Sequence, residues 1–384
     1  MDWTSLPCSI YRGGTSKALL LRQQDLPKDP KTRDQMILYL FGSPDAKQVN
    51  GLGGATPTTS KLGIVKVSSR PDADIDYTFG QVSIDTAFVD YRPNCGNVSS
   101  AIGPFAVEQG MVPAHEDGWI SVRIYNTNTD SLIVSRFLVN HGHFVPDGET
   151  TIPGVPGTGS PIYLDFFDAG GSVTGKLFPT GRRADDITLP DGRTFHVTVI
   201  DVGNLTILMD SDELSLEGTE ISEQQLKHAL PTMEQVRQQI GRMLGVFRQG
   251  EVVTPTTHAL PKIAAVQSAR DYQSSDGRTI PAKDCDITAR VLTMGRLHPT
   301  YAVTGAMALT VSAKFSGTIG FEKASLNSRK SHRLRIGHPA GVLEMQAEVT
   351  DCPDPRVSRV TLIRTARPLI TGNASVPVFR GVVS

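Results

Sequence analysis

The sequence has little that suits a disulfide-bonded, metal-bound or membrane-spanning protein. Its four cysteines, Cys8, Cys95, Cys285 and Cys352, are far apart and form no Cys-x-x-Cys pair, so neither a disulfide framework nor a zinc site is indicated. No apolar run approaches the roughly 18 residues of a membrane helix. The start of the chain has no basic region followed by an apolar one, so we expect no secretory signal and a reducing, cytoplasmic location.

The chain also lacks an excess of either charge. Lysine plus arginine numbers 38 and aspartate plus glutamate 39, and this near balance argues against general affinity for nucleic acid, which needs a basic surface. A phosphate-binding P-loop and motifs for a metal, nucleotide or flavin are absent as well. We therefore expect a small-molecule partner, with neither nucleic acid nor membrane involved and with no cofactor or metal. A homodimer stays open.

What the sequence does contain is enough chain for two hydrophobic cores. It has 384 residues, of which 39% are hydrophobic and 20% charged, and its 36 glycines and 25 prolines indicate many turns between strands. The expected class is α+β, with an N-terminal half over 1–185 and a C-terminal half over 186–384. The halves should join near 178–193, where glycine, proline and charged residues cluster.

The order of elements in the first half recurs in the second. Alternating apolar residues and turn signals predict two short strands, a helix, further strands, a second helix and a hairpin in each half. In the first half these are Ser9–Tyr11, Leu19–Leu21, Thr32–Phe41, Leu62–Val67, Thr78–Val82, Phe88–Tyr91, Val98–Gln109, Ile120–Tyr125 and Leu132–Val139. In the second they are His196–Val202, Leu205–Met209, Ser222–Gly241, Pro261–Val266, Asp286–Met294, Thr304–Lys314 and Leu334–Val349.

Three segments of the first half carry residues suited to chemistry. Arg12-Gly13-Gly14-Thr15-Ser16-Lys17 is either an anion-binding turn or an ordinary glycine hairpin with exposed cations. Cys95 stands where a strand meets a helix, a position that lowers a thiol pKa, although most free cysteines are small buried hydrophobes. Lys61 opens an apolar strand and, if buried, would suit a general base; the alternative is a solvated strand-end lysine.

The second half has fewer residues suited to catalysis at the corresponding positions. Lys262 occupies the place that Lys61 has in the first half, so we expect both lysines near a cleft between the domains. His298 and His338 could each donate to a carboxylate, but capping a turn explains them equally well.

Several motifs together resemble the methylaconitate isomerase (PrpF-like) family, along nearly the whole chain. They are Tyr11–Lys17, Gly42–Asp45, Gly51–Gly54, Thr59–Lys61, Asn94–Asn97, Pro261–Lys262, His298–Ala306 and Gly337–Gly341. Relatives in this family include 3-methylitaconate Δ-isomerase, 4-oxalomesaconate tautomerase and aconitate Δ-isomerase. The resemblance implies the diaminopimelate epimerase-like fold, in which two pseudo-symmetric domains, each with a central helix wrapped by mainly antiparallel strands, enclose the active site.

The resemblance also implies a cofactor-independent isomerase that moves a double bond in an unsaturated di- or tricarboxylic acid. The family's catalytic lysine matches Lys61 and its cleft cysteine matches Cys95. We expect the helix starts in both halves to face one cleft that contains Lys61. The residues expected to bind the substrate are Arg12, Gly13, Gly14, Thr15, Ser16, Lys17, Ser60, Asn94, Gly96, Asn97, Asn204, Lys262, His298, Thr304, Gly305 and Ala306.

One difference between the halves separates reaction classes. Racemases of this fold use two thiols, one at each helix start, whereas this sequence has Cys95 before Gly96 but Thr304 before Gly305. Amino-acid racemisation is therefore disfavoured. We expect Lys61 to be the base and Cys95 to be either a second acid–base group or a pocket-lining residue, with the latter favoured. Keto–enol tautomerisation of an oxalomesaconate-like acid and non-catalytic carboxylate binding are the alternatives.

Overall fold

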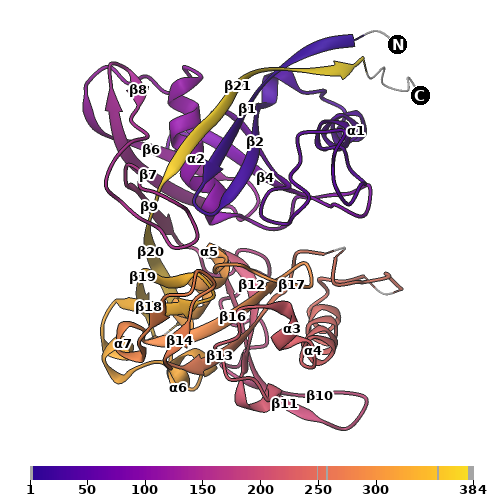
Figure 1. Cartoon of the computed structure of the whole chain (residues 1–384), viewed down its shortest axis with the longest axis vertical. Coiled ribbons are helices and arrows are strands. Elements are labelled where there is room, and N and C mark those ends of the chain that lie inside the picture. Colours follow the sequence, from indigo (N-terminus) through magenta and orange to yellow (C-terminus); the bar gives the residue numbers. More distant parts are fainter. Residues whose placement is uncertain (1–2, 249, 257, 353, 379–384) are drawn as a thin grey trace. The chain divides into compact units, whose positions relative to one another are not determined.

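The computed structural model describes residues 3–248, 250–256, 258–352 and 354–378, and the chain divides into two compact units. Unit 1 comprises Met1–Leu164 and Ile363–Ser384, and unit 2 comprises Asp165–Leu362. Figure 1 shows the elements of each unit. These bounds differ from the expected halves, 1–185 and 186–384, at both ends of unit 2.

Unit 1 is built from strands around one helix, with a second helix on the outside. Its elements are β1 (Trp3–Gly13), β2 (Ser16–Arg22), α1 (Pro30–Phe41), β3 (Lys61–Val67), β4 (Ile75–Val82), β5 (Val89–Asp90), α2 (Gly96–Glu108), β6 (Gly118–Asn126), β7 (Ser131–Asn140), β8 (His143–Phe144), β9 (Ile162–Phe167), whose last residues pass into unit 2, and β21 (Ala366–Pro377).

Unit 2 repeats this order with additional short elements. They are β10 (Asp185–Thr188), β11 (Thr194–Val202), β12 (Asn204–Asp210), α3 (Glu223–Leu226), α4 (Leu230–Met243), β13 (Lys262–Ser268), β14 (Tyr272–Gln273), β15 (Thr279–Ile280), β16 (Ile287–Thr293), β17 (Arg296–Leu297), α5 (Val303–Ser312), α6 (Ile319–Lys323), α7 (Leu326–Lys330), β18 (Arg333–His338), β19 (Gly341–Thr350) and β20 (Arg356–Arg364), which ends in unit 1.

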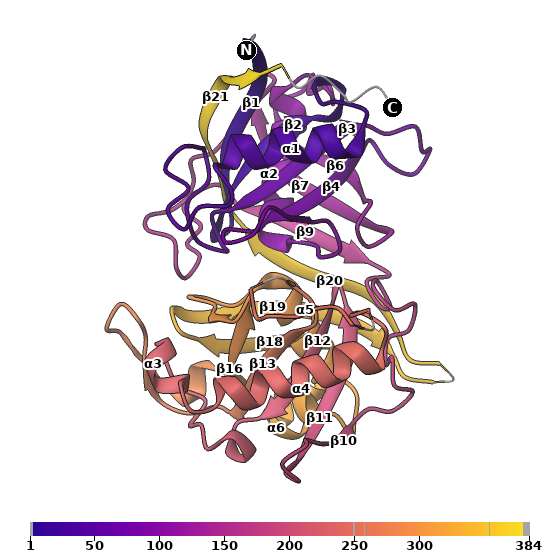
Figure 2. The same ribbon diagram turned by 90° about the vertical axis from the view of Figure 1, so that its right-hand side faces the viewer.

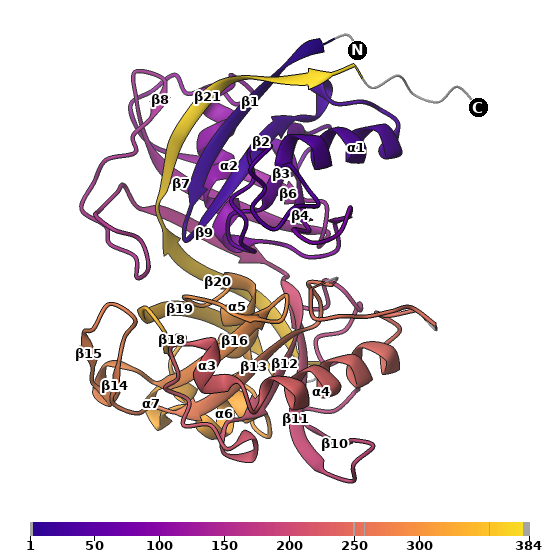
Figure 3. The ribbon, with the colours of Figure 1, turned by 45° about the vertical axis from the view of Figure 1, so that its right-hand side comes forward.

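Strand pairing explains why the unit boundaries differ from the expected ones. The C-terminal strand β21 pairs antiparallel with β1 from Trp3↔Pro377 to Gly13↔Ala366, which returns the end of the chain to unit 1 (Figure 3). The stretch 178–193, expected to join the halves, instead belongs to unit 2. Its Phe178 ring packs edge-on against Phe315 with 5.4 Å between centroids.

Each unit has a central helix that is buried on nearly all sides. Every residue of α2 except Glu108 is buried, and every residue of α5 is buried. Small side chains let the strands approach these helices closely: a Cβ added at Gly13 on β1 would lie 2.6 Å from the Asn97 carbonyl oxygen on α2. The expected arrangement of strands around a central helix is therefore confirmed.

The outer helices cover the opposite face of the strands in each unit (Figure 2). In unit 1, Leu40 and Phe41 of α1 share a buried cluster with Leu62 and Ile64 of β3. In unit 2, α4 joins a corresponding cluster with β11, β12 and β13. The central and outer helices thus lie on opposite faces of the same strands, so side chains alternate between them along each strand.

The register of the strands confirms the internal duplication. β2 and β3 are parallel with Ala18 opposite Lys61, and β12 and β13 are parallel with Thr206 opposite Lys262. The pairs β4–β6 and β16–β18 are also parallel, while the hairpins on either side of them are antiparallel. Lys61 and Lys262 therefore occupy equivalent positions, each as the first residue of its strand.

The single helix expected over Ser222–Gly241 is wrong, because the structure has two. α3 ends at Leu226 and α4 begins at Leu230. Pro231, the second residue of α4, has no backbone N–H to donate to the preceding turn, and its ring disfavours a continuous helix through that turn.

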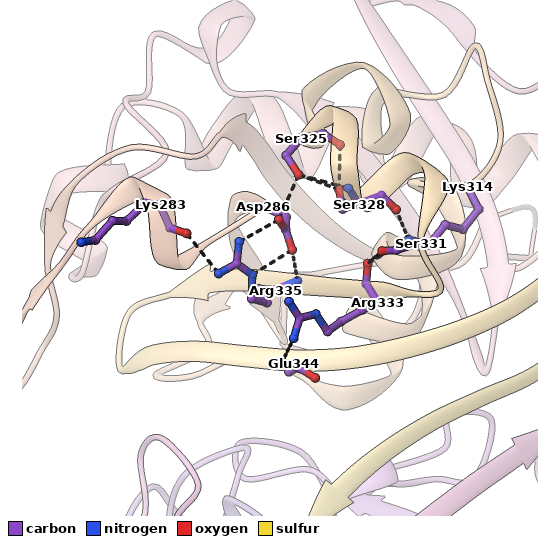
Figure 4. Close-up of polar contacts among 9 residues, drawn as sticks. All are labelled: Lys283, Asp286, Lys314, Ser325, Ser328, Ser331, Arg333, Arg335 and Glu344. Carbon is purple, nitrogen blue, oxygen red and sulfur yellow. Dashed lines mark hydrogen bonds and ion pairs between the residues drawn. The ribbon is translucent and has the colours of Figure 1, made fainter.

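A polar network fastens the strands that carry α5 in unit 2 (Figure 4). Asp286, just before β16, accepts hydrogen bonds from Arg335 Nε at 3.1 Å and Nη2 at 3.0 Å, and from Ser325 Oγ at 2.9 Å. Ser325 in turn caps α7 by accepting from the backbone nitrogen of Ser328. Asp286 therefore ties β16, β18 and α7 together.

Candidate active site

Lys61 is buried at the point where β3 begins. Its side chain is 7% exposed, and Nζ donates a hydrogen bond to Gln81 Oε1 at 2.7 Å. Gln81 lies directly opposite on β4, two residues beyond Phe79, whose ring centroid is 5.1 Å from the ammonium nitrogen. The alternative of a solvated strand-end lysine is excluded by this burial.

Burial lowers the pKa of Lys61 from its usual range, because an ammonium ion loses hydration when it leaves water. A hydrogen bond with the Cys95 side chain and the charge of its thiolate form act in the opposite direction, but they are smaller effects. Cys95 is therefore near enough to Lys61 to influence its pKa. A lysine with a lowered pKa has the neutral amine that a general base needs.

Gln81 is held so that its oxygen faces the lysine. Its Nε2 donates to the carbonyl oxygens of Ser60 at 2.9 Å and Pro57 at 3.2 Å, which leaves Oε1 to accept from Lys61. Ser60, expected to bind substrate, instead uses its hydroxyl within the protein: it donates to the Val82 carbonyl and accepts from Gln48 Nε2. These contacts fix the loop that delivers Lys61.

Cys95 is the residue that precedes α2, and its thiol is partly exposed. Asn94 orients this turn, because its Oδ1 accepts from the Cys95 backbone nitrogen at 2.6 Å and from Asn126 Nδ2 at 3.0 Å. The Cys95 side chain makes no capping hydrogen bond at the start of α2, whereas the Asp29 side chain caps α1. The first-turn N–H groups of α2 can therefore stabilise an anion.

Tyr77 forms part of the buried wall behind this pair. It lies on the same face of β4 as Gln81, and its hydroxyl has no hydrogen bond of good geometry among the described residues, although Ser99 of α2 is near. Burial, and secondly the charge of a Cys95 thiolate, raise the pKa of Tyr77 well above its usual value. Tyr77 is thus a neutral phenol at physiological pH.

The turn between β1 and β2 packs against the first turn of α2. Asn97 Nδ2 donates to Thr15 Oγ1 at 3.0 Å, and a Cβ added at Gly14, whose φ is +51°, would lie 2.1 Å from Asn97 Oδ1. Arg12 braces this turn: its Nη1 donates to the carbonyl oxygens of Gly14 and Thr365. The bracing occupies one nitrogen of Arg12, and its expected contact with substrate stays a prediction.

The remaining residues of this turn have different surroundings. Ser16 is buried, and its hydroxyl has no hydrogen-bond partner among the described residues. Lys17 is partly exposed and its Nζ lies 3.1 Å from where a Cβ on Gly54 would stand, so it is next to the loop that carries Lys61.

Arg364 lies against the first turn of α2, and the sequence analysis did not name it. It is 5% exposed, and its Nε donates to Asn97 Oδ1 at 3.1 Å. Burial lowers its pKa to about 10, so it stays charged at neutral pH. The alternation of β20 could have revealed it, since Val360, Leu362 and Arg364 face inward while Ile363 is exposed.

Unit 2 brings its own candidate residues together. Asn204 Nδ2 donates to Thr304 Oγ1 at 2.8 Å, which mirrors the contact between Thr15 and Asn97. A Cβ added at Gly305 would lie 3.9 Å from Lys262 Cδ, so Lys262 and the first turn of α5 are neighbours. Ala306 is buried within the same helix.

The helix start in unit 2 is displaced from the expected one. α5 begins at Val303, and Ala302 precedes it, because the Ala306 backbone nitrogen bonds to the Ala302 carbonyl oxygen as Ser99 bonds to Cys95 in α2. Thr304 therefore corresponds to Asn97, and the position of Cys95 is held by Ala302. With the two helices aligned in this way, unit 1 still has a thiol before its central helix and unit 2 has none.

Both histidines cap turns. His298 Nδ1 accepts from the Thr300 backbone nitrogen at 3.2 Å, and His338 Nδ1 accepts from Ala340 at 3.2 Å. The substrate contact expected of His298, and the expectation that both helix starts face one cleft, stay predictions.

The described residues were also considered as metal ligands and as membrane spans. Within the ranges that the structure describes, no cluster of three or more His, Cys, Asp or Glu side chains could hold a metal ion. No helix in those ranges is long and apolar enough to cross a bilayer.

Comparisons with known proteins connect this geometry to one family. The model of the PrpF protein family matches residues 4–377. The chain is 40% identical to 3-methylitaconate isomerase of Eubacterium barkeri, covering 97% of each chain, and 35% identical to 2-methyl-aconitate isomerase of Cupriavidus necator, again covering 97% of each.

The structural comparison gives the same result over the full length. A crystal structure of methylitaconate-delta-isomerase superposes with a TM-score of 0.80 at 38% identity, covering 100% of this chain and 99% of the other. The expected α+β fold, with its duplicated halves, is confirmed by this match.

Proposed function

Because the chain belongs to the PrpF family, we propose that it isomerises an unsaturated di- or tricarboxylic acid by moving one proton between two allylic carbons. The relatives that act on methylitaconate and 2-methyl-aconitate support this substrate class. The observation that carries the proposal is Lys61, which is buried and held by Gln81, with Cys95 near it at the start of α2.

The first step is removal of a proton by the neutral amine of Lys61. A carbon between a carboxylate and a double bond is acidic, because its carbanion delocalises as a dienolate. The lowered pKa of Lys61 increases the fraction of free amine at a given pH. Gln81 holds the amine through one N–H, so that the lone pair can be directed at the substrate carbon.

The negative charge that develops on the substrate needs preorganised donors. The first-turn N–H groups of α2 supply them, and the positive end of the helix adds to the effect. These groups are fixed before substrate arrives, because α2 is buried along its whole length except Glu108. No reorganisation is needed when charge appears.

The second step returns the proton to the other allylic carbon. Lys61, now an ammonium ion, can deliver it on the same face, and the double bond shifts with no net change in oxidation state. Cys95 lies close enough to Lys61 to serve as the alternative donor. We favour Lys61 for both transfers, since a 1,3-shift on one face needs only one base. The balance of atoms requires no cofactor.

An exchange experiment tests catalysis directly. The purified protein is incubated in deuterated water with methylitaconate, cis- and trans-aconitate, 2-methylaconitate and oxalomesaconate in turn, and each mixture is followed by proton NMR. We expect one acid to lose its allylic hydrogens to exchange and to convert to a double-bond isomer. Keto–enol conversion of oxalomesaconate alone would instead identify a tautomerase. Binding of an acid without exchange would mark a non-catalytic carboxylate-binding protein and contradict the proposal.

A further inference from the structure

Arg364 is a cation buried in unit 1 without a carboxylate beside it. Its side chain is 5% exposed, and the hydrogen bonds of its guanidinium within the described residues go to Asn97 Oδ1 at 3.1 Å and to the Ile363 carbonyl oxygen at 2.8 Å. Both acceptors are neutral. None of the ion pairs found in the described part of the chain includes Arg364, so its positive charge is not balanced there.

Other buried arginines of the molecule have an acidic group near them. Arg237, also 5% exposed, forms a salt bridge with Glu234 at 2.7 Å. Arg290, which is fully buried, is next to Glu220 and feels the charge of its carboxylate. Burying a charge without a partner is unfavourable. An arginine kept in that state suggests that its counter-charge comes from outside the protein.

The position of Arg364 connects it to the catalytic pair through one turn of helix. Asn97, which accepts from Arg364, stands two residues after Cys95, a rise of about 3 Å along a helix. Cys95 in turn is near enough to Lys61 to influence its pKa. The turn residue Gly14 adjoins the same arginine side chain, because a Cβ there would lie 3.1 Å from Arg364 Cδ.

We propose that Arg364 binds a carboxylate of the substrate and so places the allylic carbon next to Lys61. The proposal rests on the function proposed above, and it names the residue that recognises the acid in unit 1. A planar guanidinium can donate two parallel hydrogen bonds to one carboxylate. Arg12 differs from Arg364 in being only partly buried, so water can solvate its charge and no external counter-charge is required.

The test measures binding of an acid that cannot react. Tricarballylate has three carboxylates but no double bond, so its affinity by titration calorimetry is independent of turnover. We expect Arg364→Gln to bind it about 10- to 150-fold more weakly than the unaltered chain, the usual loss for a charge-assisted contact. The matched control is Arg367→Gln, which removes an exposed arginine three residues further along the chain and should bind normally.

A structural role for Arg364 predicts different results. It would lower the melting temperature of Arg364→Gln and leave the affinity of the folded protein unchanged, and unchanged affinity overturns the proposal. If Arg364→Gln does not fold, Arg364→Lys is used in its place, because it keeps the charge but loses the planar donor pair. Weaker tricarballylate binding than in Arg367→Gln then supports the proposal, and equal binding refutes it. A third outcome separates the two proposals. If the unaltered protein binds tricarballylate and Arg364→Gln does not, but the unaltered protein converts none of the acids, then the carboxylate site is supported and the isomerase function is rejected.

Discussion

The two units have one scaffold but different chemistry at the start of their central helices. In both, a buried lysine opens a strand that pairs in parallel with its neighbour, and a side chain from a hairpin contacts the second residue of the central helix. Unit 1 has Cys95 before that helix, whereas unit 2 has Ala302. The shared backbone arrangement alone therefore does not create a proton-transfer site; that depends on the side chains it carries.

The lysine pair gives the largest expected contrast between the units. Lys61→Ala removes the base and should lower kcat by about 10²-fold or more, while tricarballylate still binds. Lys262→Ala changes the equivalent position of unit 2, where the helix start carries no thiol, and should affect KM more than kcat. Steady-state kinetics of both variants measure the difference. Full activity in Lys61→Ala would overturn the mechanism.

Gln81 should control the protonation of Lys61, and opposite substitutions should act in opposite directions. Gln81→Glu places a carboxylate against the amine and raises its pKa, so activity near pH 7 should fall about tenfold or more and the acid limb of the profile should move to higher pH. Gln81→Leu removes an acceptor and should move that limb to lower pH. The pH dependence of kcat/KM distinguishes these shifts from a general loss of active-site structure, which would lower activity in both variants without moving the acid limb.

Cys95 should matter less than Lys61 if the lysine performs both transfers. Cys95→Ser keeps a small polar group before α2, so kcat should stay within about tenfold of the unaltered value. If Cys95 is the second acid–base group, kcat should fall about as far as in Lys61→Ala. Ala302→Cys, which adds a thiol at the equivalent position of unit 2, is the matched control and should leave kcat unchanged.

The smallest expected effect concerns stability. The pKa of Lys61 is lower in the folded chain than in the unfolded one, so the unfolded state binds more protons and the free energy of unfolding should rise with pH between those two values. Lys61→Met removes this contribution. The stability of the variant relative to the unaltered protein should therefore decline as pH rises towards 10, as measured by denaturation at several pH values. A constant difference would show that burial does not shift this lysine.

Local patterns in the sequence predicted the frame well. The alternation of apolar residues placed β3 and β4, and the small-residue run after Cys95 placed α2 to within two residues of its start. Those features depend on neighbours along the chain. The break between α3 and α4 was missed because the periodicity continues across it, although Pro231 interrupts the hydrogen bonding.

The contacts within the site depend on long-range packing, which the sequence shows less directly. Lys61 and Cys95 could be named as candidates from their motifs, but their proximity and the hydrogen bond from Lys61 to Gln81 follow only from the folded strands. Arg364 is 267 residues from Asn97 and belongs to none of the motifs. Its only signal was an arginine at an inward-facing position of a strand, with an exposed isoleucine beside it.

The return of β21 to unit 1 has a consequence for how the protein is made. Unit 2 is one continuous stretch of chain, whereas unit 1 needs its first and last segments together, since β21 pairs with β1 along its length. A ribosome therefore releases all of unit 2 before unit 1 can close, and until then β1 has β2 on one side but lacks β21 on the other. Arg364 arrives with that final segment, so a nascent chain holds Lys61 and Cys95 long before it holds the cation that we propose selects the acid.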